Sequence, residues 1–102
     1  MGNLEDEELI RALQSVVRGL MNHKKWKTCH SPEDTVLRRL KNTNISPKTV
    51  QKIFKQSPLF LYVKKNGSWH VSLINKYKKQ IFQLLEFDFD DLSNISEILL
   101  LD

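Results

Sequence analysis

Apolar residues recur at the three-and-four spacing of a helix in the first part of the chain, and the periodic positions are Leu9, Ile10, Leu13, Val16, Val17, Leu20 and Met21. Acidic residues precede this stretch and basic residues follow it, which is the order that a helix dipole favours. The pattern predicts an amphipathic helix over residues 5–22 and a basic loop over residues 23–30. Trp26 in that loop is expected to close the edge of the core, with stacking on a base as the alternative.

Two Ser-Pro pairs mark the starts of two further helices. Ser31 and Ser46 are expected to act as N-caps, because each precedes a proline at the first helical position. The apolar spacing predicts helices over 33–41 and 47–56, and Pro58 ends the second. Two short helices with a short connection give a helix-turn-helix outline.

A β-hairpin is predicted around Asn66-Gly67, which separates two runs rich in β-branched and aromatic residues at 59–63 and 68–73. A two-residue turn sets the register, with Lys65 opposite Ser68 and Phe60 opposite Leu73. The face expected to join the core carries Phe60, Tyr62, Trp69, Val71 and Leu73. The opposite face leaves Leu61 and Val63 either partly exposed or covered by another segment.

The C-terminal third is expected to form a helix over about 75–87 and a short apolar helix over 93–101 within an acidic segment, 88–102. We expect this segment to fold back against its own domain, where it either covers Leu61 and Val63 or only completes the core; docking on a partner and disorder are the alternatives. The chain is thus divided into a domain, 1–87, and an acidic amphipathic C-terminal segment, 88–102.

Charge is strongly segregated along a chain whose net charge is +4. Residues 1–10 and 80–102 contain acids without bases, whereas residues 11–79 hold all 16 Lys and Arg against Glu33 and Asp34. A basic centre of this kind calls for an anionic partner, such as a phosphate backbone, an acidic protein surface or the chain's own ends.

Several classes of function find no support in the residues. No apolar run approaches the length of a membrane helix. The single cysteine, Cys29, permits no intrachain disulfide and fits a reducing compartment, nuclear in preference to cytoplasmic. With His23 and His30 it lacks a fourth ligand, so we expect no metal. We also expect no cofactor and no enzyme activity, because the chain carries no catalytic motif.

A helix, a helix-turn-helix and a β-hairpin on a basic chain resemble the winged-helix superfamily, over residues 5–87. The resemblance implies an α+β, mainly helical fold: a winged helix (three-helix core with a β-hairpin wing) plus C-terminal helices. It implies a recognition helix at 46–56 and a wing tip at 64–68. The hairpin FLYVKKNGSWHVSL is similar to the wing of forkhead domains, but TVQKIFKQ lacks the forkhead recognition motif, so the specific family stays unassigned.

The helical wheel of 47–56 places three lysines opposite the apolar face, and we expect them to contact phosphates. We predict a nucleic-acid-binding domain, for duplex DNA with RNA as a lesser alternative, acting in transcription or chromatin with low sequence specificity. Its candidate binding residues are Lys48, Thr49, Gln51, Lys52, Lys55, Lys64, Lys65 and Asn66. The alternative is a winged-helix protein-interaction module, with a partner surface formed by Leu61, Val63, Ile95, Ile98 and Leu99.

Overall fold

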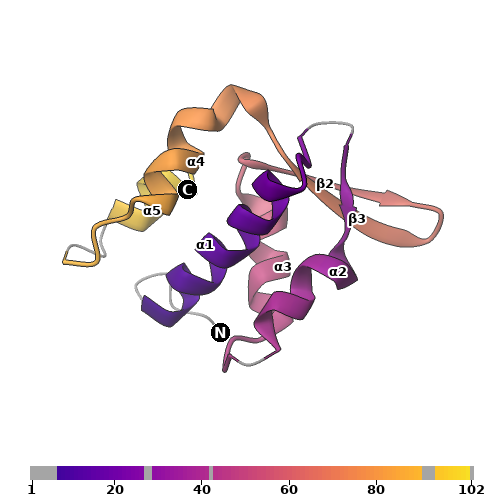
Figure 1. Ribbon diagram of the computed structural model, residues 1–102, viewed down its shortest axis with the longest axis horizontal. Coiled ribbons are helices and arrows are strands. Elements are labelled where there is room, and N and C mark those ends of the chain that lie inside the picture. Colours follow the sequence, from indigo (N-terminus) through magenta and orange to yellow (C-terminus); the bar gives the residue numbers. More distant parts are fainter. Residues whose placement is uncertain (1–6, 27–28, 42, 91–93, 102) are drawn as a thin grey trace.

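Helices form most of the chain, and a small antiparallel sheet lies at one end. Figure 1 shows the computed structural model, which describes residues 7–26, 29–41, 43–90 and 94–101. The elements in chain order are α1 (Glu7–Asn22), β1 (Ser31–Pro32), α2 (Glu33–Leu37), the 3-10 helix η1 (Arg38–Leu40), α3 (Pro47–Gln56), β2 (Phe60–Lys65), β3 (Ser68–Leu73), the 3-10 helix η2 (Asn75–Tyr77), α4 (Lys78–Leu85) and α5 (Ile95–Ile98). This confirms an α+β, mainly helical fold.

The core lies where α1, α2 and α3 meet the inner face of the sheet. The predicted apolar face of α1 is buried, and Leu13, Val16 and Val17 are fully enclosed. In Figure 1, α1 crosses in front of α3, with α2 beside them. The first two residues of the helix predicted over 5–22 lie outside the described residues. Trp26 packs against the edge of this core, as expected.

The hairpin has the predicted register at all six pairs, from Phe60 opposite Leu73 to Lys65 opposite Ser68. Its turn residues, Asn66 and Gly67, have φ angles of 53° and 81°. A type I′ turn requires positive φ at both central positions, and Asn-Gly adopts these angles most readily. Local turn chemistry therefore determines the pairing of β2 with β3.

A third strand corrects one expectation, because Ser31 is not an N-cap. It is buried in β1 and pairs with Val71 of β3, which gives the sheet the order β1-β3-β2. Pro32 occupies the N-cap position of α2 and makes no side-chain cap hydrogen bond. The predicted helix over 33–41 is shorter than expected, since α2 ends at Leu37 and the chain continues as η1.

The described part of the C-terminal segment folds back on the domain and completes its core, which is one of the two expected positions. The helix predicted over 75–87 is divided into η2 and α4. Of the helix predicted over 93–101, residue 93 lies outside the described residues, and four of the described ones form α5. In Figure 1, α5 lies beside α4, at the end of the molecule away from the hairpin turn. Ile95 and Leu99 belong to the main core, at 1% and 0% exposure. They are thus held inside the domain and do not form a cover over the hairpin.

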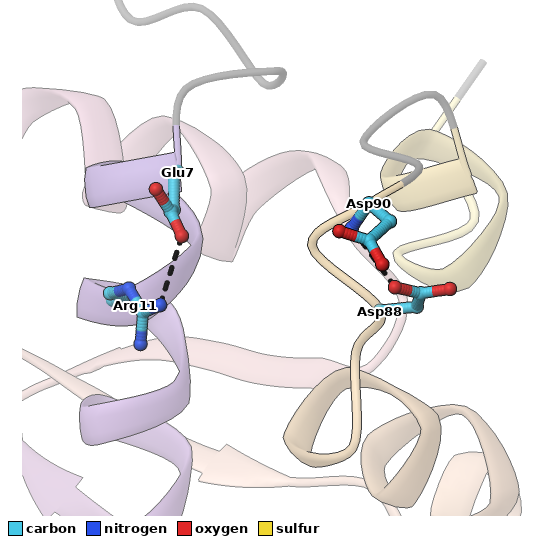
Figure 2. A network of polar contacts seen from close by, with 4 residues as sticks. All are labelled: Glu7, Arg11, Asp88 and Asp90. Atoms are coloured by element: carbon cyan, nitrogen blue, oxygen red, sulfur yellow. Dashed lines mark hydrogen bonds and ion pairs between the residues drawn. The ribbon is translucent and has the colours of Figure 1, made fainter.

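Polar contacts hold this end of the molecule together. The Ser57 hydroxyl donates a hydrogen bond of 2.6 Å to the carbonyl of Leu99, and the Gln14 amide donates one of 3.0 Å to the carbonyl of Leu84. Arg11 pairs with Glu7 at 2.9 Å and lies 4.3 Å from the ring centroid of Phe89. Figure 2 shows this pair on α1 facing the loop in which the amide of Asp90 donates to Asp88.

Candidate nucleic-acid interface

Helix α3 carries the predicted lysine face, and its start is fixed by the expected cap. The Ser46 hydroxyl accepts a hydrogen bond from the amide of Lys48 at 3.3 Å, and Pro47 occupies the first helical position. One side of the helix is buried through Val50, Ile53 and Phe54. The opposite side exposes Lys48, Lys52 and Lys55. The structure thus brings the three predicted lysines together on one surface, along about 10 Å of helix.

Aromatic rings join the end of α3 to the hairpin. Phe54 packs against Tyr62 with ring centroids 5.6 Å apart, and Tyr62 stacks on Trp69 at 4.5 Å with an interplanar angle of 11°. The ammonium of Lys55 lies 5.8 Å from the centroid of Trp69, within the range of a cation–π interaction. Lys64 is the cross-strand neighbour of Trp69 and is exposed. Lys55 is therefore held towards the hairpin.

The hairpin turn presents the remaining predicted binding residues. Lys65 and Asn66 are exposed together with Lys64. Both turn residues have positive φ, and Gly67 has only a hydrogen atom in place of a side chain. Lys64 lies on the face that carries Trp69 and Lys55, whereas Lys65 lies near His30 on the opposite face, so an anionic partner reaches both lysines only at the tip.

Glu33 reduces the number of polar side chains on α3 that are available to contact a base. Its carboxylate accepts a hydrogen bond of 2.7 Å from the Gln51 side chain of α3 and another from the hydroxyl of Tyr62. Gln51 is therefore engaged within the protein, whereas Thr49 is half-buried and Gln56 is exposed. Burial raises the pKa of Tyr62, and its hydrogen bond to Glu33 and the charge of that carboxylate raise it further. The phenol therefore stays protonated and acts as a donor.

Acidic groups also border the hairpin on the side of α2. A cleft of about 220 Å³ between the start of α2 and the hairpin is lined by Glu33, Asp34 and Trp69, among others. Trp69 thus lines the same cleft as two acidic residues, while Lys55 lies near its ring. This acidic border was not predicted, because it arises from the pairing of β1 with β3, which brings the start of α2 to the hairpin.

The predicted partner surface is not one surface in the structure. Leu61 and Val63 are half-buried on the outer face of the sheet and do not pack against the main core. Ile95 and Leu99 are buried in that core, and Ile98 packs against it. The C-terminal members of the predicted set are therefore structural, and Leu61 and Val63 remain as the candidates for contact.

The outer face of the sheet also carries a histidine pair. The Nδ1 atoms of His30 and His70 are 3.0 Å apart, so one ring donates to the other. Desolvation lowers the pKa of His30, and the nearby charges of His70, Lys65 and Lys25 lower it further. Over the residues that the structure describes, no group of three His, Cys, Asp or Glu side chains is arranged to hold a metal ion.

Comparison with protein-family models, with curated proteins and with solved structures finds no match. None of the described helices is both long and apolar enough to cross a membrane.

Proposed function

We propose that this chain is a winged-helix domain that binds nucleic acid, with duplex DNA as its target and transcription or chromatin in the nucleus as its setting. The proposal includes no catalytic activity. It is supported by the order of elements, since α1, α2 and α3 precede a hairpin that extends from the core. In this arrangement α3 is the recognition helix, and the turn between β2 and β3 is the wing tip.

The observation that carries the proposal is the uncompensated charge of α3. The ion pair found between described residues joins Arg11 to Glu7, so Lys48, Lys52 and Lys55 face no acid at ion-pair distance within the described part of the chain. Three exposed ammonium groups at this spacing suit a series of backbone phosphates, and each contact releases condensed counterions.

Low sequence specificity follows from the groups that accompany these lysines. Lysine lacks the bidentate fork with which arginine reads guanine, and α3 contains no arginine. Gln51, a candidate for reading adenine, is hydrogen-bonded to Glu33. Base contacts from α3 would rest on Gln56 and the half-buried Thr49.

The test is a salt titration of binding to a labelled duplex, with single-stranded DNA and RNA of the same sequence in parallel. The variant combines Lys48→Gln, Lys52→Gln and Lys55→Gln. The matched control combines Lys76→Gln, Lys78→Gln and Lys79→Gln, which removes the same charge from exposed positions of η2 and α4. We expect the α3 variant to reduce the dependence of log affinity on log salt by roughly 2–3, at about 0.9 for each phosphate contact.

The control is expected to retain most of the wild-type slope. Equal losses in the two triple variants would mean that net charge alone drives binding, and the proposal would be wrong. If RNA or single-stranded DNA binds more strongly than the duplex, that nucleic acid is the target and duplex DNA is not.

A second candidate function is protein interaction, which the exposed edge of the sheet favours. Strand β2 lies at the edge of the order β1-β3-β2, and its outer face carries Leu61 and Val63 away from the core. An open edge with apolar side chains pairs readily with another strand. This function predicts self-association in analytical ultracentrifugation that is lost in Val63→Asp and retained in Ser68→Asp, a change at an exposed position beside the turn.

A further inference from the structure

A basic cleft lies between α1 and the segment from β1 to η1, apart from the lysine face of α3. Its volume is about 300 Å³, and its basic lining residues are His23, Lys25, Arg38 and Arg39. None of its described lining residues belongs to α3, β2 or β3. The cleft is therefore a separate feature from the proposed nucleic-acid interface.

The positive charge of this basic cleft is uncompensated. No carboxylate is among the described residues that line it. The two acids nearest in sequence, Glu33 and Asp34, line the other cleft, beside Trp69. The ion pair between Arg11 and Glu7 does not involve the basic cleft. A group of cationic side chains with no acid among them favours the binding of an anionic ligand.

Gly19 shows how one arginine is placed in the cleft. A Cβ atom at this buried position of α1 would lie 2.3 Å from Nε and 2.6 Å from Cζ of Arg39. The guanidinium therefore rests against bare helix backbone. Glycine inside a helix costs roughly 1 kcal/mol relative to alanine, and the gain here is the close approach of Arg39.

The rest of the lining mixes hydroxyl-bearing residues, among them Ser31, with apolar residues that are at most 5% exposed. Val16, Leu20 and Val36 contribute to the wall of the cleft, and the hydroxyl-bearing Thr35 lies beside them. A volume of about 300 Å³ is at the lower end of the range for small-molecule sites. It exceeds what an inorganic phosphate alone would fill. The ligand that fits this lining has an anionic group and is larger than one phosphate.

We propose that the basic cleft binds a small organic phosphate, with the phosphate held by Arg38, Arg39 and Lys25 and the organic part in the remaining volume of the cleft. Guanidinium groups suit phosphate because they donate two parallel hydrogen bonds to it. The lysine face of α3 lacks this chemistry. Because the two sites share no described residue, we expect the organic phosphate and a duplex to bind without competing.

Calorimetry with the full chain tests the proposal, with adenosine monophosphate and pyrophosphate as probes and adenosine as the uncharged control. Arg39→Gln is expected to weaken binding of adenosine monophosphate at least about tenfold, as for the loss of a charge-assisted contact. Arg18→Gln is the matched control, because Arg18 is exposed on α1 and does not line the cleft. It should leave the affinity within about twofold.

Gly19→Ala provides a second variant that preserves every charge. The added methyl group displaces the Arg39 side chain, so binding is expected to weaken several-fold while the helix itself is stabilised. This variant separates loss of the site from loss of folding.

Three results would overturn the proposal. The first is no binding of either probe at millimolar concentration. The second is equal binding by Arg39→Gln and Arg18→Gln. The third is displacement of adenosine monophosphate by a short duplex whose own binding is weakened by Arg39→Gln, since the cleft would then belong to the nucleic-acid interface. Unchanged duplex binding in Arg39→Gln, with loss of adenosine monophosphate binding, supports two separate sites.

Discussion

Glu33 connects three elements, because it begins α2 while its carboxylate accepts hydrogen bonds from Gln51 of α3 and Tyr62 of β2. Hydrogen bonds to a charged group contribute about 1.5–3 kcal/mol each, more than neutral ones. A half-buried carboxylate with two donors therefore sets the position of the hairpin relative to α3. It also removes Gln51 from the groups available to a base.

Replacing this carboxylate tests its role. Glu33→Gln is expected to lower the free energy of unfolding by about 1–2 kcal/mol in urea, since an amide offers one acceptor where the carboxylate offers two. Asp34→Asn is the matched control: Asp34 is exposed, and its change should stay within about 0.5 kcal/mol. Equal effects at the two positions would mean that the net charge, and not the hydrogen bonds, is responsible. In Glu33→Gln the pKa of Tyr62 should also fall, as followed by ultraviolet absorbance.

The histidine pair predicts a pH dependence of stability. Desolvation lowers the pKa of His30 in the folded state below its ordinary value of 6.5, with a further lowering by the charges of His70, Lys65 and Lys25. Between the two values the unfolded chain binds more protons, so the free energy of unfolding falls as the pH falls through this range. Above this pH range the imidazole is neutral in both the folded and the unfolded state, so the free energy of unfolding no longer depends on its titration.

We therefore expect lower stability at about pH 5.5 than at about pH 7.5 in urea unfolding. His30→Gln should flatten this dependence, because the titrating ring is gone. His23→Gln should preserve it, since the exposed His23 belongs to the basic cleft and not to the pair. A dependence that survives in His30→Gln would show that other groups cause it.

Among the elements, the hairpin depends most directly on a local conformation. Gly67 has φ of 81°, and a Cβ atom there would meet no atom within 4 Å. Gly67→Ala is therefore expected to cost about 1 kcal/mol of unfolding free energy through backbone strain alone. Ser68→Ala, beside it on the exposed start of β3, should have less than half this effect. Urea unfolding measures both, and a neutral Gly67→Ala would show that the turn adopts another conformation.

The elements that the sequence predicted well are those specified by nearby residues. The hairpin register followed from a two-residue turn, and the start of α3 followed from Ser46 and Pro47. Strand β1 was missed because two residues carry no periodicity, and Ser31-Pro32 before two acids matches a helix start. Its strand conformation is stabilised by pairing with Val71, 40 positions away in the chain.

The same limit applies to the candidate site. A helical wheel correctly placed the lysines of α3 outside and its apolar residues inside, because both depend on the helix period alone. It did not reveal that Glu33 holds Gln51, or that Arg39 lies against α1. Gly19 was the local indication of the contact between Arg39 and α1, because a glycine inside a predicted helix often marks the close approach of another group.

Over the whole molecule, the acids at the start of α1 and in the loop after α4 lie at the end away from the hairpin turn, whereas Glu33 and Asp34 lie beside the hairpin. The start of α1 lies opposite the loop that contains Asp88 and Asp90, and α5 lies beside α4 at the same end (Figures 1 and 2). The long axis of the molecule is 41 Å, whereas charges are screened over about 8 Å at physiological salt. These acids are thus poorly placed to mask the lysines of the hairpin turn.

The C-terminal segment instead contributes to folding, and Leu99 tests this. Its side chain is fully buried and its carbonyl accepts the Ser57 hydrogen bond, so Leu99→Ala should lower the free energy of unfolding by about 2–5 kcal/mol. Leu100→Ala is the matched control, because that neighbour is 37% exposed and should change stability by less than about 1 kcal/mol. Urea unfolding of both variants measures the difference.

A large loss of unfolding free energy in Leu99→Ala would mean that removal of residues 88–102 exposes the core. A change in duplex binding after this truncation would then result from unfolding. The charge of the segment is then best tested by Asp88→Asn with Asp90→Asn, two exposed changes that leave the core intact. With the acids far from the hairpin turn, duplex affinity should rise less than about threefold at physiological salt. If Leu99→Ala and Leu100→Ala are equally stable, the C-terminal segment does not contribute to the core and is a separate tail.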